Sequence, residues 1–182
     1  MSWKSSAHQY GGVAIAIHWL SAAAILALFA LGFLAANAAD PAVKAALLRV
    51  HVPLGFVALL LTLLRIGWWF IDRRPPQLAG LPGWQAASER IVRVLLYGLI
   101  LVMGASGIAT MILSGAAAVL FFGAAGPLPD FWHFPPMNAH FAGAIALLAL
   151  AVLHIVAALH HQFYKRDRIL TRMWTTRVEP GC

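Results

Sequence analysis

The chain has 182 residues, of which 62% are hydrophobic and only 10% charged, and its formal net charge is +7. Soluble domains carry about 25% charged residues, so this composition excludes a water-soluble globular protein and predicts one whose solvent is lipid. The cations form no stripe on a soluble domain, which excludes nucleic acid as a partner. The single cysteine excludes a disulfide or a cysteine-held metal cluster within one chain.

Four apolar stretches are long enough to cross a bilayer, which takes about 20 residues. Short polar or proline-containing breaks separate them; for example, Asp72 followed by two arginines and two prolines ends the second stretch. We therefore predict an all-α protein, an integral membrane four-helix bundle in which the whole chain, 1–182, forms one domain. The predicted spans are about 13–36, 50–71, 91–113 and 139–162.

Lysine and arginine are divided unequally between the two sides of these spans. Lys44 and Arg49 lie between the first two spans, whereas the other eleven of the thirteen basic residues lie on the tails or around the second connection. The positive-inside rule therefore predicts that both termini are cytoplasmic. Spans two and four then both run from outside to inside. The eleven residues are Lys4, Arg65, Arg73, Arg74, Arg90, Arg93, Lys165, Arg166, Arg168, Arg172 and Arg177.

Four of the eight histidines lie within or at the start of a span, where an imidazole is costly without a partner. For any one of them, a hydrogen bond to a neighbouring helix explains the position equally well. His140 and His154 are 14 residues apart, nearly four turns, so both lie on one face, about 21 Å apart. By depth, His51 pairs with His140 in an outer layer and His18 with His154 in an inner one. Two imidazoles from different helices are typical axial ligands of an electron-carrying haem.

Arg65 follows His51 by the same 14 residues and therefore shares its face at the depth of the inner layer. A buried arginine needs an anion, and a haem propionate would provide one through a bidentate contact. Snorkelling to the inner headgroups is the alternative. His161, seven residues after His154, is a rival for the inner ligand position, or an interfacial residue near a propionate or a quinone.

Three segments resemble the bacterial cytochrome b561 family, and the likeness covers nearly the whole chain. It is closest to the small single-chain members that act as superoxide oxidases. The resemblance implies a four-helix bundle in the bacterial inner membrane, two b-type haems, electron exchange with ubiquinone, and the four span histidines as axial ligands to haem iron. The segments are Ile17-His18-Trp19-Leu20, His51-Val52-Pro53-Leu54-Gly55 followed by Arg65, and Leu153-His154 leading into 160–165.

The resemblance implies that superoxide delivers electrons at the outer face and that ubiquinone accepts them. Lys44 and Arg49 would attract a small anion towards His51, although two solvated charges on a short loop explain them nearly as well. The alternative is an electron-transfer subunit, without catalysis of its own, for a dehydrogenase or another respiratory enzyme that docks on the aromatic loop 114–138. A histidine-based transporter is a third possibility, disfavoured because the spans contain no acidic residue. No residue pattern locates the quinone site.

Overall fold

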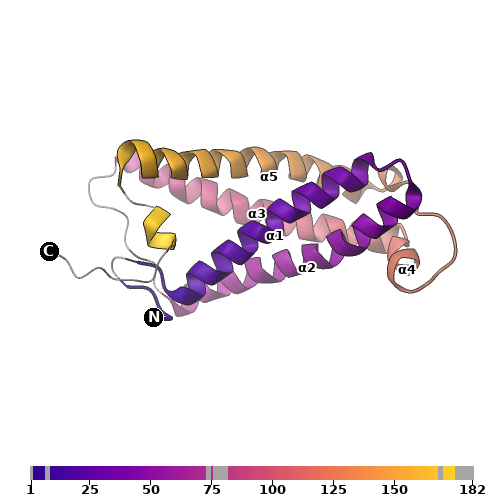
Figure 1. Cartoon of the computed structure of the whole chain (residues 1–182), viewed down its shortest axis with the longest axis horizontal. Helices are drawn as coiled ribbons and strands as arrows, with labels where there is room; N and C mark the ends of the chain where they lie inside the picture. The colour runs from indigo at the N-terminus through magenta and orange to yellow at the C-terminus, as the bar shows by residue number, and fades with distance from the viewer. Residues whose placement is uncertain (1, 7–8, 73–74, 76–81, 168–169, 175–182) are drawn as a thin grey trace.

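The computed structural model describes residues 2–6, 9–72, 75, 82–167 and 170–174. In these residues four long helices are apolar enough to span a membrane, and no strand occurs, which confirms the predicted all-α fold (Figure 1). Each predicted span lies within one of the four. The helices are α1 (Gly12–Asn37), α2 (Pro41–Ile71), α3 (Gly83–Leu113), α4 (Ala116–Phe121), η1 (Phe131–His133), α5 (Pro135–Leu159), the π-helix η2 (His160–Lys165) that continues α5, and η3 (Leu170–Met173).

The second long helix begins nine residues earlier than the predicted span. Asp40 caps α2 by accepting a hydrogen bond from the backbone N–H of Ala42 at 2.8 Å, and Pro41 occupies the first helical turn. Hydropathy detects only the apolar part of a helix and therefore missed these polar turns. As a result, His51 lies about 15 Å along α2 rather than at its start. Lys44 and Arg49 also lie on the helix, so their expected placement on a loop was wrong.

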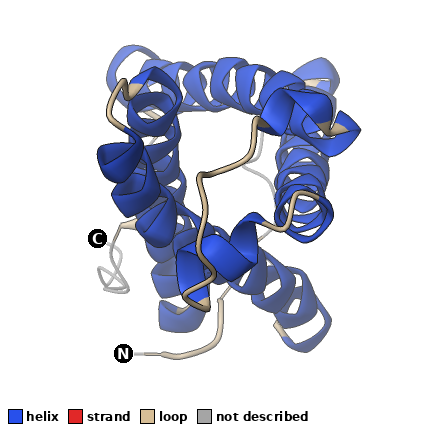
Figure 2. Cartoon of the chain, turned by 90° about the vertical axis from the view of Figure 1, so that its right-hand side faces the viewer, coloured by secondary structure: helices blue, strands red, loops and turns tan. Residues whose placement is uncertain are grey.

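The long helices pack as two hairpin pairs, α1 along α2 and α3 along α5, and α2 also contacts α3. Seen along the bundle, the four helices surround a common axis (Figure 2). Large apolar side chains remain exposed along them, for example Leu34, Leu60, Ile112 and Val152. A lipid bilayer is the solvent that such a surface requires, and helices suit it because their backbone polar groups pair internally.

We call the end of the bundle that carries α4 the outer end and the opposite end the inner end, following the predicted topology (Figure 1). Which side of the membrane each end faces stays a prediction. The basic residues Arg73, Arg74, Arg168 and Arg177, which contribute to it, lie outside the described residues.

The connection between α3 and α5 forms a cap at the outer end. Its core consists of Ala116, Leu120 and Phe131, all buried. Arg49 donates a hydrogen bond from Nε to the carbonyl of Leu120 at 2.9 Å, and Lys44 Nζ lies 5.9 Å from the centre of the Phe131 ring. These two cations in the outer part of α2 therefore attach the outer cap to the bundle.

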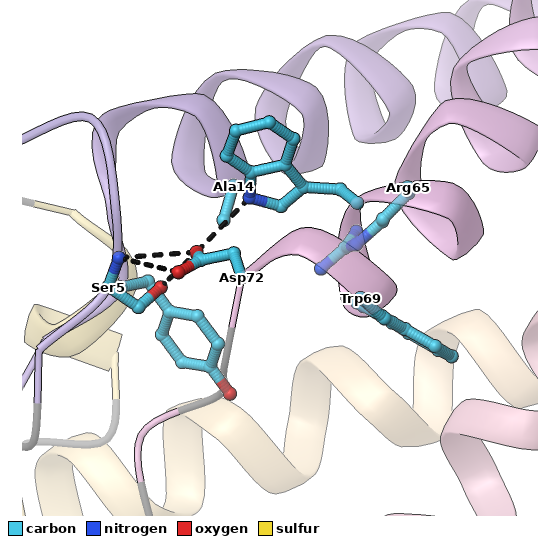
Figure 3. Close-up of a pocket in the computed structure, with 7 residues that line it drawn as sticks. Ser5, Ala14, Arg65, Trp69 and Asp72 are labelled. Atoms are coloured by element: carbon cyan, nitrogen blue, oxygen red, sulfur yellow. Dashed lines mark hydrogen bonds between the residues drawn. The ribbon is translucent and has the colours of Figure 1, made fainter.

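The N-terminal segment is attached to the inner end of α2 through a buried carboxylate. Asp72 is only 6% exposed. It accepts hydrogen bonds from the backbone N–H of Ser5 at 2.9 Å, from the Ser5 hydroxyl at 2.6 Å and from the indole N–H of Trp68 at 3.1 Å (Figure 3). Gly11 is needed nearby, because a Cβ there would lie 2.4 Å from the carbonyl oxygen of Trp3.

We expect Asp72→Ala to destabilise the protein by about 3 kcal/mol, because three donors lose a charged acceptor in a buried position. In detergent, the thermal unfolding midpoint should fall by roughly 6–12 °C. Asp130→Ala is the matched control, since Asp130 caps η1 with a side chain that is 58% exposed. Equal midpoints for the two variants would contradict a structural role for Asp72.

Candidate functional site

The outer pair of histidines is assembled in the structure. His51 of α2 and His140 of α5 have ring centroids 6.3 Å apart and ring planes at 69°. An imidazole nitrogen binds a first-row metal ion at about 2.0–2.1 Å, so two imidazoles on opposite sides of one ion have centroids about 6 Å apart. The separation of the two rings therefore fits two axial ligands of one haem iron.

The hydrogen bonds of His140 leave the correct nitrogen available for a metal. Its Nδ1 lies 3.1 Å from the backbone carbonyl of Met103 and 3.2 Å from the hydroxyl of Ser106. A carbonyl only accepts, so Nδ1 carries the proton and Nε2 keeps its lone pair. Metal-bound histidines are usually oriented by this kind of contact.

A glycine of the neighbouring helix lies against each imidazole of the outer pair. A Cβ at Gly32 of α1 would lie 3.2 Å from Cε1 of His51, and a Cβ at Gly107 of α3 would lie 3.2 Å from Cε1 of His140. The Nδ1 atom of His51 is buried and makes no hydrogen bond of normal geometry with the described residues, although the Leu28 backbone lies near it. The two glycines therefore make room for the rings, which agrees with the expectation that glycines such as Gly32 and Gly107 provide the low-profile positions that a haem needs.

At the inner end, Arg65 lies beside His18, as the predicted layers require, but its partner was not foreseen. Arg65 Nη1 donates a hydrogen bond to His18 Nδ1 at 2.8 Å, and the guanidinium carbon lies 5.8 Å from the centre of the Tyr97 ring. Arg65 and Asp72 also line one small cavity of about 20 Å³ together with Tyr10 (Figure 3). A cavity of this size holds about one water molecule.

His154 is less enclosed than the outer histidines. It lies within electrostatic range of His18 and Arg65, and of charged residues on α3, so it belongs to the same layer. Its side chain is nevertheless exposed, whereas His18, His51 and His140 are partly buried. His18 and His154 are therefore close enough to interact electrostatically, but His154 is less enclosed than the outer histidines.

His161, the rival of His154, has a partner of its own. Its Nδ1 contacts the carboxylate of Asp167, which follows η2 in the chain. This contact depends on a change from α-helix to π-helix at His160 and was not visible in the spacing of the histidines.

The two outer cations do not form an isolated positive site. Arg49 donates a hydrogen bond from Nε to the outer cap, and Lys44 lies over the aromatic ring of Phe131. Asp40 and Asp130 lie at the same end of the bundle, where each caps a helix. The formal charges of these four residues cancel, so a steering role depends on the exposed side chain of Arg49 more than on net charge.

The four apolar helices and the paired imidazoles define a helical membrane protein with a candidate bis-imidazole metal site between two of its helices. Residues 9–176 match the profile of the family described as prokaryotic cytochrome b561. The chain is 28% identical over 183 residues to "Cytochrome b561 homolog 2" of Escherichia coli (strain K12), covering 95% of each chain. It is also 35% identical over 128 residues to "Cytochrome b562" of Cereibacter sphaeroides, covering 70% of this chain and 68% of that one.

The chain therefore belongs to the prokaryotic cytochrome b561 family. It is a membrane b-type cytochrome of electron transfer, and its cofactor is haem b. The outer pair fits that cofactor for three reasons. The two rings are separated as two axial ligands of one iron are, Nε2 of His140 carries no proton and can bind a metal, and a glycine lies against each ring and leaves room for it.

Proposed function

We propose that the chain holds two haems b, the outer one between His51 and His140 and the inner one between His18 and His154. The ring separation of 6.3 Å in the outer pair is the observation that carries this proposal. The 14-residue spacing from His140 to His154 and the proximity of His154 to His18 support the inner site. Haem with two axial imidazoles supplies one-electron transfer and does not readily bind oxygen.

Arg65 positions the inner site in this proposal. While Arg65 donates to Nδ1 of His18, the proton of a neutral His18 ring is on Nε2. For Nε2 to bind a metal, the ring proton has to move to Nδ1 and the guanidinium has to turn to another acceptor. A haem propionate is an acceptor that arginine binds well, by two parallel hydrogen bonds.

The protein transfers electrons from a donor at the outer face, superoxide, to ubiquinone in the membrane. The exposed guanidinium of Arg49 supports an anionic donor, since it lies two residues before His51 at the outer end of α2. The family match supports a bacterial inner membrane location, and the distribution of lysine and arginine supports cytoplasmic termini.

The test is to add superoxide and decylubiquinone to the purified protein and to follow haem reduction and quinone reduction together. We expect reduced haem bands and quinone reduction faster than the uncatalysed reaction. The rate should fall as ionic strength rises, because screening weakens the attraction of an anion. Arg49→Gln should lower the rate a few-fold and leave the haem content unchanged.

One result would contradict the superoxide part of this proposal, and a second measurement then tests the quinone part separately. If the protein does not accelerate the reduction of decylubiquinone by superoxide, superoxide is not the donor. If quinol still reduces the haem in that case, electron exchange with quinone stands and the outer donor is a protein partner.

A further inference from the structure

A buried serine of α3 lies beside the outer pair of imidazoles. Ser106 is only 8% exposed, and its Oγ lies 3.2 Å from Nδ1 of His140, 34 residues further along the chain. The same Nδ1 lies 3.1 Å from the carbonyl oxygen of Met103. One ring nitrogen of His140 therefore has two oxygen atoms of α3 within hydrogen-bond distance.

The direction of the bond between Ser106 and His140 follows from the proton of the hydroxyl. Ser106 donates that proton to the carbonyl of Val102, one turn earlier on α3, at 2.7 Å, and the Met103 carbonyl at 3.2 Å is a more distant second acceptor. A serine hydroxyl has one proton and two lone pairs. Because the proton is directed to the helix backbone, Oγ accepts from Nδ1, and the ring N–H is shared between Oγ and the Met103 carbonyl.

Two acceptors on Nδ1–H make the imidazole of His140 a stronger electron donor through Nε2. An acceptor on the ring proton raises the basicity of the other ring nitrogen, through which the ring would bind iron. A more basic ligand stabilises ferric over ferrous iron, so this hydrogen bond lowers the reduction potential of a bound haem. A hydroxyl that itself donates is also a better acceptor, because hydrogen bonds in a chain polarise one another.

The other histidines near the two candidate sites have different surroundings. Nδ1 of His51 is buried and makes no hydrogen bond of normal geometry within the part of the chain that the structure describes. Nδ1 of His18 lies against a donor, Nη1 of Arg65, rather than an acceptor. A side-chain acceptor on Nδ1 therefore distinguishes His140 from both of these rings, and it acts on the outer layer alone.

We propose that Ser106 is a positioning residue that orients the ring of His140 and lowers the reduction potential of the haem held by the outer pair. The inference rests on the proposed function and adds to it a residue that sets the outer potential. A lower potential makes the reduced outer haem a stronger donor to the next electron carrier. The hydroxyl of Ser106 therefore favours onward transfer of the electron.

The experiment compares Ser106→Ala with the wild-type protein in anaerobic redox titrations followed by the visible spectrum. Ser88→Ala is the matched control, because Ser88 is an exposed serine of α3 that also donates to the carbonyl one turn earlier, that of Trp84, at 2.8 Å. Ser106→Thr is the rescue variant. Threonine keeps the hydroxyl, and Thr110 on the same helix already makes this type of bond, to the Ser106 carbonyl at 2.8 Å. Haem content and the electron paramagnetic resonance spectrum of the oxidised protein are measured for each variant.

In Ser106→Ala we expect the reduction of one haem to become about fivefold more favourable, an upward shift of about 40 mV at about 59 mV per tenfold change for one electron. This is smaller than the roughly 10–100-fold effect of removing an outer contact of a metal ligand, because the Met103 carbonyl still accepts from the ring. The low-spin resonance signal of the same haem should shift. The other haem and the haem content should not change, and Ser88→Ala and Ser106→Thr should titrate as the wild type does.

Three outcomes would overturn the inference. Unchanged potentials in Ser106→Ala would show that the hydroxyl does not act on the haem. Equal shifts in Ser106→Ala and Ser106→Thr would assign the change to packing rather than to the hydrogen bond. A shift of the same size in Ser88→Ala would remove any particular relation of Ser106 to His140.

Failure of the proposed function gives a different result from failure of the inference. A wild-type protein with a single haem per chain would contradict the proposal of two haems. Ser106→Ala still decides the inference in that case, since a raised potential of the single haem supports it and an unchanged potential overturns it.

Discussion

We expect replacement of His140 with leucine to halve the haem content of the protein, from the two haems per chain that we propose to one, and we expect the same of His154→Leu. Leucine has a similar volume but no nitrogen, so the iron in that layer loses an axial ligand while the other layer keeps both. The haem-to-protein ratio, measured as the pyridine haemochrome, tests this directly. The double variant is expected to bind no haem.

The control for these variants is His133→Leu. His133 lies at the outer end in η1 with a side chain that is 79% exposed, so its loss should leave both haems in place. A His140→Leu protein that keeps two haems would refute the outer site. If His154→Leu keeps both haems and His161→Leu loses one, His161 is the inner ligand.

We expect Gly107→Val to displace the outer haem, although the side chain at position 107 is not an iron ligand. Even a Cβ at this position would lie 3.2 Å from Cε1 and 3.4 Å from Nδ1 of His140, and the two methyl groups of valine need more room. The ring must turn and lose its hydrogen bond to Met103. Losing the orientation of a ligand typically costs about 10–100-fold in metal affinity, which a haem titration of the apoprotein measures.

Gly98→Val is the matched control, because Gly98 lies on the same helix and a Cβ there would meet nothing within 4 Å. Valine is also a better helix former than glycine, so this variant should bind haem as the wild type does. Equal losses of affinity in the two variants would show that substitution of any α3 glycine disturbs the bundle, and that Gly107 has no particular relation to His140.

The sequence by itself determined the four membrane helices and the grouping of His51 with His140. A span is recognisable because lipid requires a long apolar segment whose backbone hydrogen bonds are made within the segment itself. Its length, its apolar composition and its hydrogen bonding all depend only on residues close together in the sequence. The layers were predictable because a helix is rigid, so 14 residues always correspond to the same face and the same rise.

Contacts between distant parts of the chain were decided only by the tertiary structure. Arg65 donates to His18, 47 residues away, and Arg49 holds the Leu120 carbonyl, 71 residues away. Helical periodicity places a side chain on a face but does not select its partner across the bundle. The contact of His161 with Asp167 needs both a π-helical turn and a left-handed Arg166, two departures from regular geometry that no hydropathy pattern contains. The sequence therefore predicts where the haem layers lie, and the tertiary structure decides which side chains surround them.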